Sequence, residues 1–261
     1  MAAEIEHIPV KPGEAPGWRA RIGLLLLATD YATESEMPRL WPGDDGSVAW
    51  FTSRVPNASP ITVDTLRAMG PELARAAGTI LPGARLNALA YGCTSATVLL
   101  GVAETKALLT RGHRDVPVTT PAIGALAAFG ALGTARVSVL TPYTDPINTA
   151  IAAFLESHGH SVARFGSFHL DSDAEMSGVT ETDIARAAVA IDAPDAEALF
   201  ISCTALRATG TIAALEAELG KPVVTSNQAM IWHALRLAGV FDARPGLGRL
   251  FTRDLDGNAA V

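Results

Sequence analysis

Short apolar runs alternate with longer segments of helical character along most of the chain. The clearest runs cover residues 22–28, 86–91, 137–141 and 198–202, and they consist mainly of Leu, Val, Ile and Ala. Strands that are buried on both faces of a parallel sheet have this pattern, because neither face meets water. Strands that alternate with helices predict an α/β fold in which helices cover both faces of parallel sheets.

The predicted elements account for most of the chain. Strands are expected at residues 22–28, 86–91, 116–119, 137–141, 161–168, 198–202 and 222–225, and helices at 63–77, 95–109, 122–132, 146–157, 180–191, 211–219 and 227–238. Residues 29–60 are predicted to be a long connection, which in a compact domain is usually functional or a lid. Residues 171–178 are expected to form a polar loop.

The order of these elements repeats once. Arg21 opens the first strand of one half and Arg136 opens the corresponding strand of the other. Cys93 follows Arg21 by 72 positions, and Cys203 follows Arg136 by 67. The repeat predicts two pseudo-symmetric lobes, each a parallel sheet flanked by helices, with an active site in the cleft between them.

The repeat also sets the expected domain boundaries. Residues 1–20 are predicted to be an N-terminal arm, residues 21–134 the first lobe and residues 135–242 the second lobe. The last predicted helix, at 227–238, can pack back on the first lobe. Residues 243–261 are polar and are expected to form a loose tail.

The chain has two cysteines, and both have the same local context. Cys93 and Cys203 each end an apolar run, and each is followed by threonine and a segment with helical character. Ligands bind to open α/β sheets at the carboxyl ends of the strands. A helix N-terminus also stabilises a thiolate, which is the reactive form of cysteine. The alternative is two inert core cysteines, but their matching flanks favour a functional pair.

Composition excludes several classes of partner. The net charge is −7 and no Lys/Arg run is present, so neither nucleic acid nor an anionic membrane surface is an expected partner. Two cysteines do not make a disulfide framework, which predicts a reducing, cytoplasmic location. The acidic residues among 1–16 are not typical of a signal peptide, and no apolar run has the length of a membrane span.

Most common catalytic motifs are missing. The sequence has no G-x-G-x-x-G dinucleotide fingerprint, no G-K-[ST] phosphate loop, no H-E-x-x-H, no C-x-x-C and no G-x-S-x-G elbow. A dinucleotide site, a phosphate loop and a metal site are therefore not expected. A Cys-His-Asp triad stays open, because its members meet only in space.

Four segments carry a resemblance to a known family. They are Tyr-Gly-Cys-Thr-Ser at 91–95, Leu-Thr-Pro-Tyr at 140–143 with Asn148, Ile-Ser-Cys-Thr at 201–204 and Pro-Val-Val-Thr-Ser-Asn-Gln-Ala at 222–229. Together they resemble the aspartate/glutamate racemase superfamily, in the branch of maleate cis-trans isomerase, arylmalonate decarboxylase and the ectoine-utilisation protein EutA. The resemblance implies two lobes that clasp a small carboxylate substrate without a cofactor. A homo-oligomer is compatible with it.

The resemblance also implies roles for individual residues. Cys93 matches the nucleophile of the isomerases, and Cys203 matches its acid/base partner. Tyr143 matches a tyrosine that holds the substrate carboxylate. The other expected donors to that carboxylate are Thr94, Ser95 and Thr204. The decarboxylase keeps only the second cysteine, so the presence of both argues against that branch.

Two departures from the family pattern bear on the substrate. Asp30 stands where maleate isomerases have asparagine, and a second family asparagine has no clear counterpart in the loop at 171–173. An aspartate would repel a second substrate carboxylate or accept a hydrogen bond from a substrate nitrogen. We therefore predict that Asp30 lies at the cleft rim and sets substrate choice, with a helix or turn cap as the alternative.

The sequence supports three functions. The leading one is a cofactor-independent isomerase or racemase that acts on a small carboxylic acid through two cleft cysteines, as in maleate isomerase or a EutA-like protein. The second is an arylmalonate-type decarboxylase. The third is a catalytically degenerate carboxylate-binding protein of a catabolic pathway.

Overall fold

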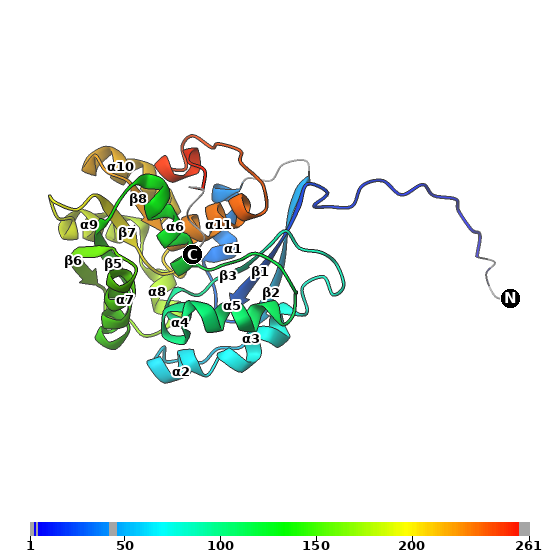
Figure 1. Cartoon of the computed structure of the whole chain (residues 1–261), viewed down its shortest axis with the longest axis horizontal. Coiled ribbons are helices and arrows are strands. Elements are labelled where there is room, and N and C mark those ends of the chain that lie inside the picture. Colours follow the sequence, from blue (N-terminus) through cyan, green and yellow to red (C-terminus); the bar gives the residue numbers. More distant parts are fainter. Residues whose placement is uncertain (1–2, 4, 42–45, 256–261) are drawn as a thin grey trace.

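The computed structural model describes residues 3, 5–41 and 46–255, and within them the chain folds into two four-stranded parallel sheets flanked by helices (Figure 1). The strands are β1 (Ala20–Leu27), β2 (Val48–Val55), β3 (Ala88–Tyr91), β4 (Val118–Thr119), β5 (Arg136–Thr141), β6 (Ser161–Ser167), β7 (Ala198–Ile201) and β8 (Val223–Thr225). The first sheet has the order β2-β1-β3-β4 and the second the order β6-β5-β7-β8. Both sheets therefore have the same topology, which confirms the predicted two-lobed α/β fold.

Helices connect the strands and cover the sheets. They are α1 (Thr33–Leu40), α2 (Val63–Arg67), α3 (Gly70–Ala77), α4 (Thr94–Leu100), α5 (Val102–Thr110), α6 (Pro121–Leu132), α7 (Asp145–Ser157), α8 (Asp173–Gly178), α9 (Glu181–Ile191), α10 (Ile212–Leu219) and α11 (Ser226–Leu237), with short 3-10 helices η1 (Thr209–Thr211) and η2 (Arg249–Thr252). The predicted helix at 95–109 is interrupted at Gly101, whose φ of 90° is a conformation that glycine adopts without strain.

The middle strands of each sheet are buried along almost their whole length. All four residues of β3 and all four of β7 are buried, as the continuous apolar runs predict. The last residue of β3, Tyr91, pairs with Leu25 of β1. The last residue of β7, Ile201, pairs with Leu140 of β5, so β3 and β7 end at equivalent places in the two sheets. The residues that follow β3 and β7 therefore emerge at the carboxyl edges of their sheets.

The last helix of each half contacts the sheet of the other half. Helix α11 packs against β3 and β4, and helix α6 packs against β8. The ring of Phe129 in α6 also lies 5.6 Å from that of Phe200 in β7. The contact of α11 with the first lobe was expected from the sequence, but the reciprocal contact of α6 was not. The two helices also pack on each other, so they join the lobes.

The contact between α6 and α11 depends on Gly124. A Cβ atom at this position would lie 2.6 Å from the backbone oxygen of Ala229. We expect Gly124→Ala to lower the free energy of unfolding by roughly 1–3 kcal/mol, the usual cost of overpacking. Gly130→Ala is the matched control, because a Cβ there meets no atom within 4 Å. It should leave stability unchanged or raise it by up to about 1 kcal/mol. Equal effects in urea unfolding would contradict this account of the helix contact.

The predicted connection at residues 29–60 contains two regular elements. Helix α1 and strand β2 lie there, and β2 pairs in parallel with β1 at the edge of the first sheet. Only the two end residues of β2 are buried, so its sequence lacks a continuous apolar run. The polar loop predicted at 171–178 is likewise wrong, because α8 begins there with Ser172 accepting a hydrogen bond from the Glu175 N–H.

The expectation of a loose tail after residue 242 is wrong for the part that the structure describes. Leu250 and Phe251 of η2 are fully buried. The indole N–H of Trp232 in α11 donates to the Arg253 carbonyl at 3.0 Å, and Gln228 donates to the Leu247 carbonyl at 2.7 Å. Two apolar side chains and these hydrogen bonds hold the segment on α11. Residues 256–261 lie outside the described residues.

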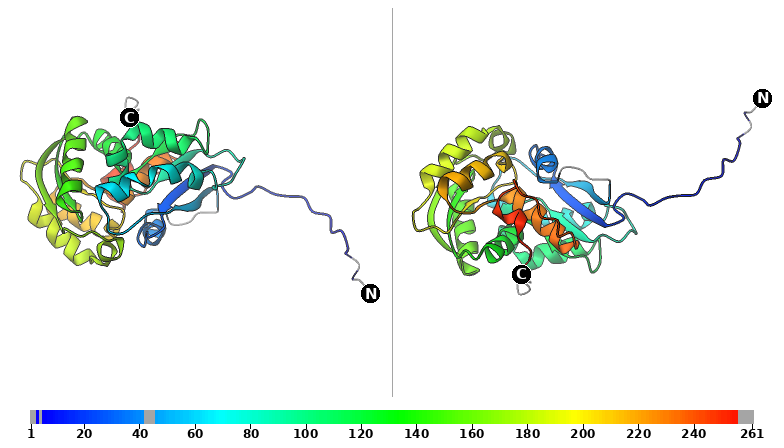
Figure 2. Two further views of the ribbon diagram at one scale, coloured as in Figure 1. Left: turned by 90° about the horizontal axis from the view of Figure 1, so that it is seen from below. Right: turned by 90° about the horizontal axis from the view of Figure 1, so that it is seen from above.

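The N-terminal arm leaves the body of the protein. Residues 5–16 form no helix or strand and extend away from both lobes in every view (Figures 1 and 2). The arm joins the body where Arg19 pairs with Asp242. Among the described residues no helix has the length and apolar character of a membrane span.

Candidate active site

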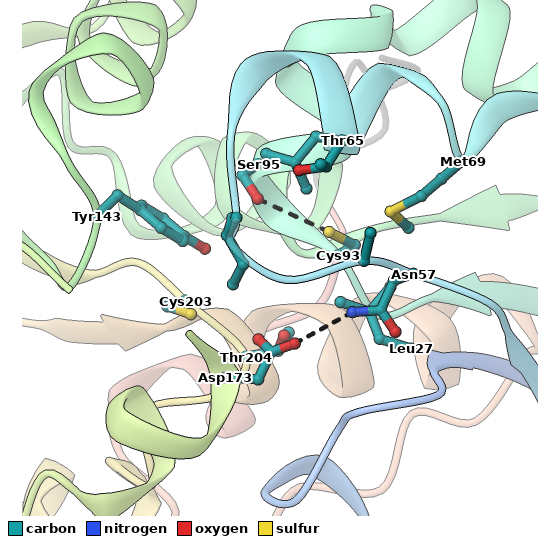
Figure 3. Close-up of a pocket in the computed structure, with 13 residues that line it drawn as sticks. Leu27, Asn57, Thr65, Met69, Cys93, Ser95, Tyr143, Asp173, Cys203 and Thr204 are labelled. Atoms are coloured by element: carbon teal, nitrogen blue, oxygen red, sulfur yellow. Dashed lines mark hydrogen bonds between the residues drawn. The ribbon is translucent and has the colours of Figure 1, made fainter. Parts of the chain in front are cut away.

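Segments that follow β3 and β7 line a pocket between the two lobes (Figure 3). The polar lining residues are Asn57, Thr65, Cys93, Ser95, Tyr143, Asp173, Cys203 and Thr204, and the apolar ones are Leu27, Ala58, Ile61, Leu66 and Met69. Five of the seven residues predicted from the sequence are therefore brought together here. The two that do not line the pocket are Thr94 and Asp30.

The pocket is nearly closed. Its volume is about 20 Å³, close to the least that holds one water molecule. The Asp173 carboxylate accepts hydrogen bonds from Thr29 and Asn57, so it ties α8 of the second lobe to the first lobe beside the pocket.

Cys93 caps helix α4. Its backbone is extended, and its sulfur accepts a hydrogen bond from the Ala96 N–H at 3.4 Å and lies 3.7 Å from the Ser95 hydroxyl. The side chain is nevertheless only 3% exposed. The cysteine is therefore at a helix N-terminus, as the sequence predicts, but it is shielded from water.

Cys203 has a different local structure. Its sulfur accepts a hydrogen bond from the Ala205 N–H at 3.3 Å, and the hydroxyl of Tyr143 points towards it. The chain after Cys203 forms a turn, and helix α10 begins only at Ile212. The expectation that Cys203 directly precedes a helix is therefore wrong. The residues from Ala205 to Ala208 are good helix formers, so local propensity does not explain the turn; the Thr204 carbonyl instead accepts a hydrogen bond from Asn227 of α11.

Both thiols are neutral in this pocket at pH 7. Burial raises the pKa of the Cys93 thiol to about 11 and that of the Cys203 thiol to about 12. The nearby Asp173 carboxylate contributes to both of these raised pKa values, as a smaller cause than burial. Hydrogen bonds from backbone N–H groups oppose these shifts but do not cancel them. The thiolate that a helix N-terminus would favour is therefore not the resting form of either cysteine.

This electrostatic setting predicts how the thiols are alkylated. A thiol with a raised pKa is protonated at all pH values below that pKa, so iodoacetamide labelling of Cys93 should be slow at pH 7 and rise towards pH 11. Asp173→Asn removes a negative charge and should move the midpoint of the pH profile to lower pH. Asp171→Asn is the control, because Asp171 is exposed. Mass spectrometry of the labelled peptides measures each profile, and a wild-type plateau by pH 8 would contradict the prediction.

Tyr143 points its hydroxyl into the pocket, towards Cys203 and Ser95 (Figure 3). Asn148 holds the tyrosine in place, since its side-chain N–H donates to the Tyr143 carbonyl at 2.8 Å and its oxygen accepts from Thr141. Burial raises the pKa of the Tyr143 hydroxyl well above its usual value. The group is therefore a protonated hydrogen-bond donor.

The three predicted hydroxyl donors divide into two kinds. Ser95 and Thr204 line the pocket, and Thr204 also donates to the Gly92 carbonyl at 3.3 Å. Thr94 does not line it, because its hydroxyl pairs with that of Ser226 at 3.0 Å. The backbone N–H of Thr94 is in the first turn of α4, where the amides lack partners within the helix.

Asp30, predicted to lie at the cleft rim, does not line the pocket, and the structure supports the alternative of a helix cap. Its carboxylate accepts hydrogen bonds from the Ala32 N–H at 2.9 Å and from the Thr33 N–H at 2.8 Å. It also accepts one from the Thr33 hydroxyl at 2.7 Å, so it caps the start of α1. The acid that lines the pocket is Asp173, at the start of α8, together with Asn57 from the loop after β2.

A buried polar cluster supports the Cys203–Thr204 segment from behind. Asn227 of α11 donates to the Thr204 carbonyl at 2.9 Å and to the Glu36 carboxylate at 2.6 Å. Glu36 also accepts from the Thr209 N–H at 2.8 Å. The cluster fixes the second-lobe cysteine segment against the first lobe. The described residues contain no group of three or more His, Cys, Asp or Glu side chains arranged to hold a metal ion.

A family model for arylmalonate decarboxylase matches residues 74–251, which is more than half of the chain. The chain belongs to the arylmalonate decarboxylase family. Its relatives include arylmalonate decarboxylase of Bordetella bronchiseptica, 35% identical over 164 residues, covering 60% of this chain and 68% of the relative. A maleate isomerase of Nocardia farcinica is 26% identical over 242 residues, covering 90% of this chain and 96% of the relative.

Two solved structures share the fold. A cysteine-to-alanine variant of the maleate isomerase of Pseudomonas putida S16 with maleate has a TM-score of 0.82, with 21% identity over 89% of this chain and 97% of the other. A liganded double mutant of arylmalonate decarboxylase has a TM-score of 0.80, with 28% identity over 89% and 99%. These matches confirm the resemblance that the segments around the two cysteines indicate.

Proposed function

We propose that the protein is a cofactor-independent isomerase or racemase of a small carboxylic acid, with Cys93 and Cys203 as the reacting groups. The observation that carries this proposal is the arrangement of two thiols, from equivalent strand ends of the two lobes, on one pocket. The maleate isomerase of Nocardia farcinica matches nearly the whole chain, which supports an isomerase over a protein of unrelated activity.

The substrate carboxylate is expected to bind on the side of the pocket formed by Ser95 and Tyr143. The first N–H groups of α4 lack partners within the helix, and the helix dipole favours a negative charge there. The hydroxyls of Ser95 and Tyr143 add two more donors, and hydrogen bonds to a charged acceptor are the stronger kind. The same donors stabilise the extra negative charge of an enediolate.

Two thiols on one pocket permit proton transfer at one carbon. One cysteine, as the thiolate, takes the proton from the carbon next to the carboxylate and becomes a thiol. The electron pair of the broken C–H bond moves into the enediolate. The other cysteine, as the thiol, gives its proton to the opposite face and becomes the thiolate. The two cysteines have then exchanged protonation states and the product has the opposite configuration.

The same residues permit a covalent route on an unsaturated acid. The thiolate of Cys93 adds to the double bond and Cys203 protonates the neighbouring carbon. After rotation about the new single bond, Cys203 removes that proton and the C–S bond breaks. The products are the trans acid and the original thiolate. The proposal covers both maleate and the substrate of a EutA-like protein as possible small acids.

A decarboxylase is the second candidate, and the family match favours it. Arylmalonate decarboxylase of Bordetella bronchiseptica is the relative with 35% identity. In this alternative Cys203 alone protonates the carbanion that remains after CO₂ is lost from a malonate. Cys93 would then be dispensable, which separates the two candidates.

The test is an NMR screen in D₂O with purified protein and four small acids. The acids are maleate, ethylmalonate, 2-aminobutyrate and 2-methylbutyrate. The proposal predicts cis-trans isomerisation, or racemisation with deuterium uptake, for at least one acid, without CO₂ release, and this interconversion is lost in both Cys93→Ser and Cys203→Ser. Release of CO₂ that persists in Cys93→Ser would establish the decarboxylase instead. Binding of these acids without any turnover would contradict both and leave a carboxylate-binding protein.

A further inference from the structure

The pocket contains a carboxylate that the proposed chemistry does not use. Asp173 lies at the start of α8 and lines the pocket together with both cysteines. One of its oxygens, Oδ2, accepts hydrogen bonds from Thr29 and Asn57. The other, Oδ1, makes no hydrogen bond within the described part of the chain. It is therefore available to a ligand.

No cationic side chain balances this acid. Among the described residues that line the pocket there is no lysine, arginine or histidine. The charge that acts on Asp173 is that of another acid, Asp30. Burial and the charge of Asp30 both raise the pKa of the Asp173 carboxyl. The pocket as it stands is thus poorly suited to a ligand with two negative charges.

The polar groups of the pocket are also segregated. In Figure 3 the Ser95 hydroxyl and the Asp173 carboxylate lie on opposite sides of the two sulfur atoms. A carbon placed between the sulfurs would have one substituent directed towards Ser95 and Tyr143, and another directed towards Asp173. The first position suits a carboxylate, and the second suits a group that donates hydrogen bonds.

We infer that the substrate is a small monocarboxylate with a cationic or N–H-donating nitrogen on the carbon next to its carboxylate, and that Asp173 binds this nitrogen. The inference rests on the proposed function and names the substrate class of the same site. The remaining substituent of that carbon faces the apolar wall that includes Ile61, Leu66 and Met69. A dicarboxylate such as a malonate would place its second negative charge against Asp173.

Binding of such a substrate also helps to generate the thiolate. The carboxylate of Asp173 is one of the groups that keep both thiols protonated. A substrate ammonium beside Asp173 offsets this negative charge and lowers the pKa of the thiols. The same contact therefore selects the substrate and favours the reactive form of the cysteines.

The test compares three ligands that differ in one substituent. 2-Aminobutyrate, ethylmalonate and 2-methylbutyrate have the same ethyl group and carboxylate, with an ammonium, a carboxylate or a methyl as the third group. Their dissociation constants are measured by calorimetry for the wild type, Asp173→Asn and the control Asp171→Asn. Asparagine at 173 keeps an oxygen that accepts the hydrogen bonds of Thr29 and Asn57 but has no charge, so the closed pocket should persist.

The wild type should bind 2-aminobutyrate at least about tenfold more tightly than ethylmalonate, because hydrogen bonds to charged groups have this strength. Asp173→Asn should change the ratio by at least about tenfold in favour of ethylmalonate, with 2-methylbutyrate little affected. Asp171→Asn should match the wild type. A wild type that prefers ethylmalonate, or a ratio that does not change in Asp173→Asn, would overturn the inference.

Binding and turnover distinguish this inference from the proposed function. If the expected preference is found but no deuterium enters any ligand, the inference stands and the proposed catalysis fails. If interconversion of the isomers or enantiomers requires both cysteines but the preference does not depend on Asp173, the proposed function stands and the inference fails.

Discussion

Replacing either Cys93 or Cys203 by serine is expected to lower the turnover number by about 10²- to 10⁴-fold, the usual contribution of a positioned acid or base. Both sulfurs lie on the pocket, and each is held by a backbone N–H, so serine can adopt the same position. A serine hydroxyl is a much weaker acid than a thiol, so proton transfer should fail while the fold persists. Initial rates on the best acid of the screen measure the effect.

The control for this prediction is the state of the variant proteins. Each variant should have an unfolding midpoint close to that of the wild type and should still bind the acid, because neither sulfur is the main ligand of the carboxylate. A Cys93→Ser or Cys203→Ser enzyme that keeps more than a tenth of the wild-type rate would show that this thiol does not react. Loss of binding in both variants would indicate structural damage. It would contradict the expectation that the substitutions lower turnover and leave binding intact.

Tyr143→Phe is expected to lower the turnover number by about 10²- to 10³-fold, the effect of removing one donor from an oxyanion site. The hydroxyl is buried and points at the place where the carboxylate and the enediolate are expected to lie. Phenylalanine fills the same space, so the loss should be greater in kcat than in binding. Negative charge on the substrate oxygen increases in the transition state, which is why the donor contributes most there.

Tyr31→Phe is the matched control, because Tyr31 is 64% exposed and does not line the pocket. Its kinetic constants should equal those of the wild type. If Tyr143→Phe and Tyr31→Phe have the same kcat, Tyr143 is a packing residue and the proposed carboxylate site is misplaced. Rates and dissociation constants for both variants on the same acid decide between these outcomes.

The sequence predicts the two-lobed fold because the central strands are buried on both faces. Continuous apolar runs identify β1, β3, β5 and β7, and the repeat places Cys93 and Cys203 at equivalent ends of β3 and β7. The edge strand β2 was missed because most of its residues are only partly buried. Short local patterns thus predict the middle of each sheet well and its edges poorly.

The chemistry of the pocket depends on contacts between distant parts of the chain, and so most of it could not be predicted. Asp30 and Asp173 are both acids near the start of a helix, and only the folded chain shows that Asp30 caps α1 while Asp173 lines the pocket. The neutral thiols follow from burial and from the charge of Asp173, whereas local sequence favoured a thiolate. A family asparagine without a counterpart at 171–173 was the one available signal for Asp173.

The central claim is that the two thiols act on opposite faces of one carbon. The most direct measurement is deuterium exchange in D₂O for each enantiomer of a chiral acid that the wild type converts, with Cys93→Ala and Cys203→Ala. Each variant keeps one thiol, so each should exchange the proton of one enantiomer only, with opposite choices for the two variants and no interconversion by either. If both variants exchange the same enantiomer, or if one of them still interconverts the pair, the thiols do not act from opposite faces.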